Sequence, residues 1–472
     1  MRRTKIVATV GPASCSEERL AQLVEAGVDA FRLNFSHGSQ REHGDSIKRI
    51  RTVEEKAGRP VPVLQDLAGP KIRIGTFADG PVSLEAGQRF KFSTADIDGN
   101  AHEVSVNYSR LPEEVSRGDT VLLSDGALEL RVLYSTDTEV ICEVLVGGQL
   151  SSHKGINLPS GSVSLPVLTG KDESDLEYGL KHGVDCVAVS FVRTAHDILQ
   201  ERQAASRYGR EVPIIAKIEK HEALGNIDEI MAVCDGVMVA RGDLGVEMPI
   251  ECIPRYQKRL LASANHGAIP AITATHMLRS MVESPRPTRA EVTDVANAVL
   301  DGSDAMMLSE ETAVGKYPVQ AVQMMSRVIC ATEKGFPFKS WTHRAGQDEE
   351  LADEQAVAHS ACHLAEETKA AAIVTCTLSG STTRRVAKYK PQMPVIGLTP
   401  DRGVWRHLQM VWGVVPIRID GFDAPEELEK MAVDKTLASG IVRPGQKIVL
   451  TAGIPLREKG TTNFLRLVVL PH

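Results

Sequence analysis

The chain has 472 residues, of which 42% are hydrophobic and 24% are charged, and its formal net charge is −7. This length predicts more than one domain, and this composition is ordinary for a soluble globular protein. Acidic and basic residues are mixed along the chain, so neither a basic stripe for nucleic acid nor a polybasic membrane patch is expected. No stretch approaches the roughly 18 uncharged apolar residues of a transmembrane helix.

The cysteines and the N-terminus indicate a cytoplasmic protein. Eight cysteines are scattered without a Cys-x-x-Cys pair. In a chain this long they are expected to be reduced thiols, not a disulfide framework or a zinc site. The N-terminal MRRTKIVATV leads into a strand pattern and lacks the apolar region and cleavage site of a signal peptide.

Short runs rich in valine and isoleucine alternate with segments of helical spacing through most of the chain. The expected strands of this first part are Lys5–Val10, Asp29–Leu33, Val61–Leu64, Val184–Val189, Pro213–Ile218, Gly236–Val239, Ile269–Thr273 and Ala305–Leu308. Eight such units predict a closed (β/α)8 TIM barrel of residues 1–70 and 166–341. Periodicity alone leaves a doubly wound open sheet possible.

Helical spacing stops after the third strand. From residue 71 to residue 165 short alternating runs replace it, and the turn pairs Asp98-Gly99, Gly118-Asp119 and Asp125-Gly126 separate them. This pattern predicts a small β-barrel domain inserted in a barrel loop, where it would act as a lid.

A second α/β unit is expected over residues 342–472, after a charged and poorly patterned linker near Thr342 to Glu350. Its expected strands are Ala371–Cys376, Pro394–Leu398, Val414–Arg418, Lys447–Ala452 and Phe464–Val469. Helical segments separate the first four strands, which indicates an α/β domain of the open-sheet type.

Two runs on consecutive expected strands carry most of the chemistry. AKIEK places Lys217 and Glu219 at the end of one strand, and VMVARGDLGVE places Asp243 at the end of the next. Two carboxylates suit a hard cation such as Mg2+ that also binds substrate phosphates, and a lysine beside them can neutralise a transferring phosphoryl group. The alternative for either run alone is an ordinary solvated ion pair at a loop.

Most of the remaining expected barrel strands also end in polar side chains. The active sites of such barrels are built at these strand ends. They are Arg32, Asn34, Ser36, Asp66, Ser190, Arg241 and Thr275. A cap or turn explains any one of them, but not the whole set. Walker A, Rossmann and H-E-x-x-H motifs are absent from the sequence, which disfavours a P-loop kinase, a dehydrogenase and a zincin.

The segments TKIVATVGPAS, RLNFSHG, GPKIR, KGINLP, AKIEK, ARGDLGVE, ATHML and SEETAVGKYP together resemble those of pyruvate kinases, in the family's order. The resemblance covers essentially the whole chain. It implies a barrel with a β lid and a C-terminal effector domain, in an allosteric homotetramer. It further implies the transfer of a phosphoryl group from phosphoenolpyruvate to ADP in glycolysis, with Mg2+, or Mn2+ in its place.

The resemblance assigns roles residue by residue. Glu219 and Asp243 match the ligands of the divalent metal, and Lys217 matches the lysine that stabilises the phosphoryl group in flight. Arg32 and Arg73 match phosphate contacts of the substrate, Arg73 on the nucleotide side too.

Three further sets follow from the same match. Gly242 and Asp243 begin a short helix, and their backbone N–H groups would face the substrate carboxylate. Thr275 would lie beside the carbon that gains a proton, and would position a water or a relay because a threonine is a poor acid. Lys154 and Asp125, on the lid, would close over the nucleotide and its metal.

One departure from the family pattern bears on monovalent cations. Many members hold potassium with residues that match Asn34, Ser36 and Asp66, and they have a glutamate at the position of Lys71 and a threonine at that of Leu67. An ammonium at Lys71 could supply the charge of the ion, so the chain resembles a bacterial, lysine-type enzyme that does not require K+. The alternative is that Lys71 merely pairs with Asp66.

The C-terminal part contains its own candidate site. The run TLSGSTTRRV follows an expected strand and opens a helix, so its hydroxyls and N–H groups could hold a phosphate. The family binds a phosphorylated activator there, which assigns Thr377, Ser379, Gly380, Ser381 and Thr382 to the effector. GTTN, Gly460 to Asn463, resembles the second loop of that pocket. A Ser/Thr helix cap without a ligand is the alternative.

Two rival functions stay open at this point. A metal-dependent aldolase or lyase could use two carboxylates on the same barrel, but it would need neither the lid lysine nor an effector domain. A non-catalytic sugar-phosphate sensor would not need both metal carboxylates and the transfer lysine. Lys220, His276 and Glu310 depart from the commonest family residues, and their roles are not legible from the sequence.

Overall fold

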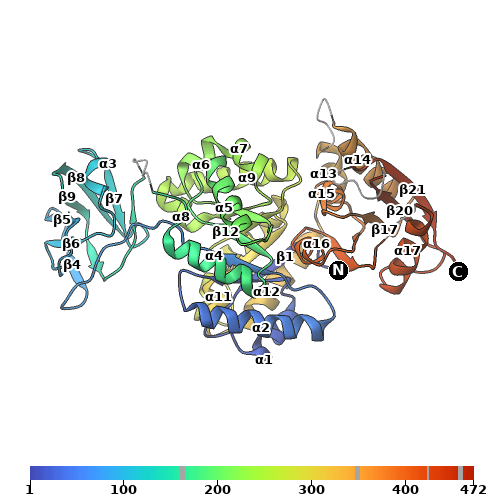
Figure 1. Ribbon diagram of the computed structural model, residues 1–472, viewed down its shortest axis with the longest axis horizontal. Helices are drawn as coiled ribbons and strands as arrows, with labels where there is room; N and C mark the ends of the chain where they lie inside the picture. Colours follow the sequence, from blue (N-terminus) through green and yellow to red (C-terminus); the bar gives the residue numbers. More distant parts are fainter. Residues whose placement is uncertain (160–164, 346–350, 422–424, 455–460) are drawn as a thin grey trace.

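The computed structural model describes residues 1–159, 165–345, 351–421, 425–454 and 461–472. Three bodies lie in a row: the inserted β part, the central barrel and the C-terminal part (Figure 1). Within the described part of the chain, no helix is long and apolar enough to cross a membrane.

The central body is a closed barrel of eight parallel strands in the order β1-β16-β15-β14-β13-β12-β3-β2. This closure confirms the TIM barrel and rules out the doubly wound sheet. The strands are β1 (Lys5–Thr9), β2 (Ala30–Asn34), β3 (Val63–Asp66), β12 (Cys186–Val189), β13 (Ile214–Ile218), β14 (Gly236–Ala240), β15 (Ala271–Ala274) and β16 (Ala305–Leu308). All but the end of β2 are buried throughout, which explains why the strand runs are apolar on both faces.

Helices surround the barrel, and α1, α2, α4 and α10 begin at a side-chain cap. Ser39 and Glu42 form a reciprocal capping box at the start of α2, and Gly58, at a φ of 62°, ends that helix in the left-handed conformation. The helices of this body are α1 (Glu17–Ala26), α2 (Gln40–Ala57), α4 (Gly170–His182), α5 (Ala195–Arg207), α6 (His221–Gly225), α7 (Ile227–Val233), α8 (Arg241–Glu247), α9 (Ile253–His266), α10 (Arg289–Leu300), α11 (Glu310–Ala313) and α12 (Pro318–Glu333). Two short 3-10 turns, Ile250–Cys252 and Arg279–Val282, complete it.

The inserted part is a curled six-stranded sheet in the order β11-β7-β8-β9-β5-β6, beside a two-stranded sheet of β10 and β4. Its elements are β4 (Val82–Leu84), β5 (Arg89–Ser93), β6 (Glu103–Ser105), α3 (Leu111–Glu114), β7 (Thr120–Leu123), β8 (Leu128–Ser135), β9 (Glu139–Val146), β10 (Gly148–Leu150) and β11 (Ile156–Asn157). The short helix α3, which starts with a proline in its first turn, was missed because four residues are too few to show a helical period.

The C-terminal part is a five-stranded sheet in the order β19-β18-β17-β20-β21, in which only β21 is antiparallel to its neighbour. Its elements are α14 (Asp353–Glu367), β17 (Ala372–Cys376), α15 (Ser381–Ala387), β18 (Val395–Thr399), α16 (Arg402–Leu408), β19 (Val414–Arg418), α17 (Pro425–Ala438), β20 (Lys447–Ala452) and β21 (Phe464–Val469). The expected linker is partly wrong, because Thr342 belongs to helix α13 (Phe338–Ala345), while residues 346–350 lie outside the described chain. The three domain boundaries stay predictions.

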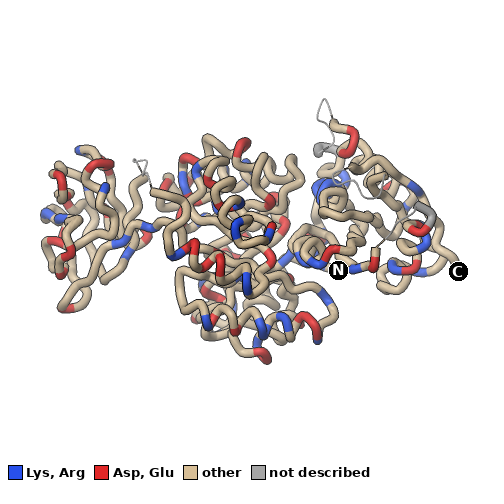
Figure 2. The backbone as a smooth tube through the Cα atoms, viewed as in Figure 1, with Lys and Arg blue, Asp and Glu red and all other residues tan. Residues whose placement is uncertain are grey.

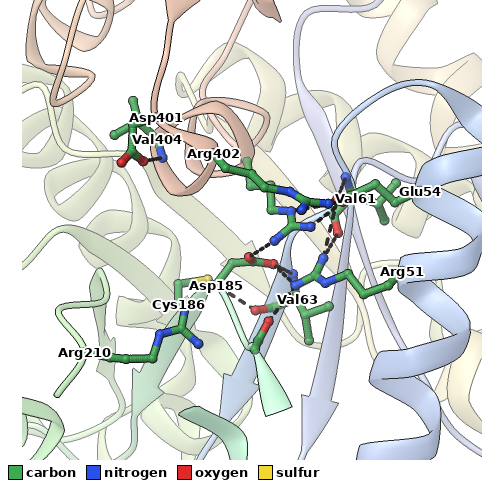
Figure 3. A network of polar contacts seen from close by, with 12 residues as sticks. Arg51, Glu54, Val61, Val63, Asp185, Cys186, Arg210, Asp401, Arg402 and Val404 are labelled. Atoms are coloured by element: carbon green, nitrogen blue, oxygen red, sulfur yellow. Dashed lines mark hydrogen bonds and ion pairs between the residues drawn. The ribbon is translucent and has the colours of Figure 1, made fainter. Parts of the chain in front are cut away.

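Charged side chains join the barrel to the C-terminal part (Figure 3). Arg406 of α16 donates to both carboxylate oxygens of Glu54 on α2, with Nε–Oε2 at 2.9 Å, and its Nη1 lies 3.2 Å from Asp185 Oδ1. Arg51 also pairs with Asp185, at 2.6 Å. Glu54 and Asp185 are almost fully buried, so removing one partner would leave an uncompensated charge inside the interface.

Glu201 on α5 generates a test of the barrel's stability. It is 0% exposed, and its two carboxylate oxygens have no hydrogen-bond partner in the described part of the chain. Burial, with smaller contributions from Asp172 and Glu173, raises its pKa to about 8. Since the folded pKa exceeds the unfolded one, the folded protein binds the extra proton, and its stability should fall as the pH rises from about 4.5 to about 8.

We therefore expect Glu201→Gln to raise the melting temperature at pH 8 and to change it far less at pH 5. Since one pKa unit corresponds to about 1.4 kcal/mol, the free energy of unfolding at pH 8 should rise by about 2 kcal/mol or more. Exposed Glu229→Gln is the matched control. Thermal unfolding followed by circular dichroism at both pH values measures the effect, and parallel pH profiles for parent and Glu201→Gln would contradict it.

Candidate active site

The ends of strands β2, β3 and β13 bring a cluster of charges together inside the barrel mouth. Lys217 Nζ lies 3.1 Å from Asp66 Oδ1 and 3.0 Å from Glu219 Oε1. Arg32 Nε lies 2.6 Å from the other oxygen of Asp66. The side chains of Lys217 and Glu219 are 11% and 2% exposed, so they are not a solvated pair at a loop.

The two residues that follow strand β12, Ser190 and Phe191, supply the polar neighbours of this cluster. Lys217 Nζ donates to Ser190 Oγ at 2.7 Å, and that hydroxyl donates to the Leu67 carbonyl at 2.8 Å. The N–H of Phe191, held at a φ of 57°, donates to Glu219 Oε2 at 2.8 Å. Sequence reasoning missed Phe191, because a main-chain donor leaves no signal in a side-chain pattern.

Burial and charge act in opposite directions on these groups. Burial alone would lower the pKa of Lys217, but Asp66 and Glu219 raise it above its ordinary value. Burial would raise the pKa of Asp66, but Arg32 and Lys217 hold it below its ordinary value. Burial raises the pKa of Glu219. Lys217 acts to lower it, but the carboxylates of Asp243 and Asp66 raise it further. Lys217 is thus a fixed cation among carboxylates.

This electrostatic imbalance fits a divalent metal at Glu219 and Asp243. The Asp243 carboxylate disfavours the charge of Glu219, and the two together are a set of oxygen donors that a hard cation would stabilise. Asp243, on the first turn of α8, keeps 30% of its side chain exposed, so the donor set is open to a substrate.

The sequence left open the alternative that Lys71 merely pairs with Asp66. The structure, which describes both residues, does not show that pair. Its ammonium lies 3.5 Å from Asp243 Oδ1 and 3.7 Å from Asp125 Oδ1 on the inserted sheet. Asp66 is instead paired with Arg32 and Lys217. Lys71 therefore places its charge beside the candidate metal ligand and at the junction with the lid.

The residues matched to a potassium site are engaged by the protein itself. Asn34 Oδ1 accepts the N–H of Ser36 at 3.2 Å, and Asp66 is held by two cations. Leu67 is 2% exposed and offers no side-chain oxygen.

Gly242 and Thr275 are brought together in a way that the sequence did not predict. The Gly242 N–H donates to Thr275 Oγ1 at 2.7 Å, and its expected contact with a substrate carboxylate stays a prediction. Thr275 has a φ of 68°, which is unusual for a β-branched residue and indicates a strained loop, and His276 beside it has a φ of 55°. Arg241 holds this loop by donating to the carbonyls of Ala274 and Thr275.

Arg73 and Lys154 lie outside the cluster. Arg73 Nη1 donates to the His153 carbonyl at 3.0 Å, and Lys154 is exposed. Among the described residues, neither makes an ion pair with Asp66, Glu219 or Asp243. Their expected contacts with the substrate stay predictions.

The loop of the C-terminal part follows β17 and opens α15, as expected. Thr377 Oγ1 accepts the N–H of Gly380 at 2.8 Å, and Ser379 Oγ donates to Ser381 Oγ at 3.1 Å. Thr382 is 2% exposed and shares a hydrogen bond with Thr462 at 2.9 Å, which joins this loop to the second one. Gly460 of the second loop lies outside the described residues.

The chain matches known proteins along its whole length. Residues 1–322 match the model of the pyruvate kinase barrel domain, and residues 355–468 match that of the pyruvate kinase alpha/beta domain. Pyruvate kinase 2 of Synechocystis is 44% identical over 99% of this chain and 79% of its own length. Pyruvate kinase of Thermotoga maritima is 42% identical over 99% of both proteins.

A solved structure of a pyruvate kinase also matches this chain. The crystal structure of a pyruvate kinase from Cryptosporidium parvum has a TM-score of 0.94 and 37% identity, and the match covers 100% of this chain and 96% of that one. The chain, a phosphotransferase, therefore belongs to the pyruvate kinase family.

Proposed function

We propose that this enzyme transfers the phosphoryl group of phosphoenolpyruvate to ADP, giving pyruvate and ATP. The observation that carries the proposal is the buried Lys217, held at 3.1 and 3.0 Å between Asp66 and Glu219, with Asp243 open to solvent beside them. A permanently charged lysine next to two candidate metal carboxylates is suited to a group whose charge lies on phosphoryl oxygens.

The residues divide the work by charge. Lys217, fixed by Ser190 and two carboxylates, would stabilise the phosphoryl group between donor and acceptor without reorganising. Arg32, oriented by Asp66, would bind the phosphate of the substrate together with Arg73. Mg2+, or Mn2+ in its place, would be held by Glu219 and Asp243 and would supply positive charge to the substrate oxygens.

The carbon end of the substrate would lie against α8 and the Thr275 loop. Its carboxylate would compete with the Thr275 hydroxyl for the N–H of Gly242, and it would also reach the N–H of Asp243. Thr275 would position a water or a relay that protonates the enolate carbon. Lys154 and Asp125 would reach the nucleotide when the lid closes.

The two rival functions lose support. An aldolase or lyase gives no reason for the lid junction, where Lys71 lies between Asp125 and Asp243. A sensor gives no reason for a buried lysine among carboxylates. Burying these charges costs desolvation free energy, and binding alone does not require it.

We also propose that the reaction does not require potassium. The ammonium of Lys71, 3.5 Å from Asp243, brings a positive charge to the side of the site where the ion would act. Asn34, Ser36 and Asp66 would then be a vestigial cation site, in which Asn34 and Asp66 already accept protein donors.

A regulated, cytoplasmic, glycolytic homotetramer is the context that we propose. The eight cysteines are free, which suits a reducing compartment. Ser379, Gly380 and Ser381, with Thr377 and Thr382 behind them, would hold the phosphate of an activator. Coupling that loop to the barrel requires two global states with different affinity for the effector.

The first prediction from this proposed function concerns Lys217. Lys217→Met should lower kcat by about 1,000-fold or more, or ~4 kcal/mol, while the KM for phosphoenolpyruvate changes much less, because the lysine acts mainly on the transition state. A coupled pyruvate assay measures this. Lys181→Met, at a lysine 65% exposed on α4, is the control. Turnover near that of the parent would remove Lys217 from this role.

The second concerns the monovalent cation. The parent should be fully active in buffers whose only monovalent cation is sodium or tetramethylammonium. Lys71→Glu should lose about tenfold or more in kcat/KM, ~1.4 kcal/mol, because it places a negative charge beside Asp243. Added potassium should restore part of the loss, and Lys181→Glu should behave as the parent. A parent that is inactive without potassium is the contrary result.

The third concerns regulation. The rate should depend sigmoidally on phosphoenolpyruvate, and a phosphorylated sugar or nucleoside monophosphate should make it more hyperbolic. Ser381→Glu should keep the maximal rate and lose this activation, because its carboxylate repels a phosphate. Ser381 is half-buried, so it is a cleaner probe than the buried Thr382. Ser381→Ala, which adds no charge, should retain more activation, and full activation of Ser381→Glu would reduce the loop to a helix cap.

A further inference from the structure

Three buried polar atoms lie close together beside the site. His221 Nδ1, Glu222 Oε2 and Glu247 Oε2 all lie within 4.8 Å of one another. Among the residues that the structure describes, none of the three has a hydrogen-bond partner, although each atom is buried. His221 Nδ1 lies 3.2 Å from the Glu222 oxygen and 3.6 Å from the Glu247 oxygen. Leaving such atoms unsatisfied costs free energy, so the cluster requires an explanation.

Two short helices of the barrel mouth create the cluster. His221 and Glu222 are the first residues of α6, directly after β13, and Glu247 is the last residue of α8. The Glu247 side chain is 1% exposed. Lys220 Nζ, at 2.7 Å, and Asn157 Nδ2, at 3.1 Å, both donate to its Oε1. These two donors leave Oε2 as the oxygen that approaches the other two atoms.

We propose that His221, Glu222 and Glu247 bind a divalent transition metal of the Zn2+ class, at a site separate from Glu219 and Asp243. Zinc takes imidazole nitrogen and carboxylate oxygen at about 2.0–2.2 Å in a tetrahedral arrangement. Ligand atoms of such a site are therefore roughly 3.3 Å apart, from the tetrahedral angle and these bond lengths. The distances of 3.2 and 3.6 Å from His221 Nδ1 match this spacing.

The donor set also separates this site from the catalytic one. An imidazole nitrogen favours zinc over magnesium, which prefers oxygen ligands alone. Glu222, Glu247 and Lys220 together have a net charge of −1, because Lys220 neutralises one of the two carboxylates. A bound dication would change this net charge to +1, which is equal in magnitude. A cavity of about 40 Å3 whose lining includes Lys220, Glu222 and Asn157 has room for a water as a fourth ligand.

The metal would have a structural role. It would cross-link the start of α6 to the end of α8, and these two helices follow the strands that present Glu219 and position Asp243. A protonated His221 that bridges the two carboxylates is the competing explanation of the same geometry, and it involves no metal.

Equilibrium dialysis of the full-length enzyme against Zn2+, with Mg2+ in large excess to occupy the oxygen-only site, tests the proposal. Metal content read by atomic emission should give one tightly held zinc per chain. His221→Ala and the conservative Glu222→Gln should each bind it at least about tenfold more weakly, since even outer-shell changes cost that much. His196→Ala, at an exposed histidine of α5, is the matched control. Asp243→Asn should keep the zinc.

The same proteins allow a measurement that is independent of dialysis. Zinc should raise the melting temperature of the parent more than that of Glu222→Gln. The proposal is overturned if the parent holds no zinc, which would leave the bridging imidazolium as the explanation. It is equally overturned if His221→Ala and Glu222→Gln retain the zinc while Asp243→Asn loses it, since the ion would then occupy the catalytic ligands.

Discussion

The rest of the site depends on a lysine that is kept charged inside the barrel. Lys217 is surrounded by Asp66, Glu219 and the Ser190 hydroxyl, and burial works against its charge while the two carboxylates maintain it. Burying Glu219 without the lysine, or the lysine without its two carboxylates, would leave an uncompensated charge inside the barrel, whereas Asp66 also has Arg32 as a partner. The ends of β3, β12 and β13 must therefore stay in register, and the closed barrel provides this constraint.

The carboxylates of the cluster share their cations unequally. Asp66 is paired with both Arg32 and Lys217, whereas Glu219 shares Lys217 with it and keeps a raised pKa, an imbalance that a divalent metal would offset. Lys71 approaches from the lid side and reaches both Asp243 and Asp125. Movement of the inserted sheet relative to the barrel would thus change the charges that surround Asp243.

Sequence patterns predicted those features that depend on periodicity and strand ends. The eight barrel strands, the C-terminal sheet and the convergence of Lys217, Glu219 and Asp66 follow from apolar runs and from the polar residues that end them. Patterns could not predict main-chain donors or partner choice. The Phe191 N–H on Glu219, the Gly242 N–H on Thr275 and the distance of Lys71 from Asp66 depend on backbone angles and side-chain reach that only three-dimensional packing sets.

The contacts between the C-terminal loop and the barrel form a continuous series. A Cβ atom on Gly380 would lie 3.4 Å from Val404 and Leu408, so the candidate effector loop packs directly against α16. Arg406 on that helix binds Glu54 and Asp185.

The series then enters the barrel at the start of β3. Asp185 Oδ2 accepts the N–H of Val63, and Glu54 Oε2 accepts that of Val61 (Figure 3). Strand β3 ends at Asp66, the partner of Lys217. Red and blue segments meet along this boundary in Figure 2, where the barrel faces the C-terminal part. Proximity alone does not make a coupling pathway, which requires an element with two arrangements that both sites bias. Arg406 is the point in this series where such an element would have to act, because its guanidinium divides its hydrogen bonds between the buried carboxylates of Glu54 and Asp185, and a small rotation of α16 would change that division.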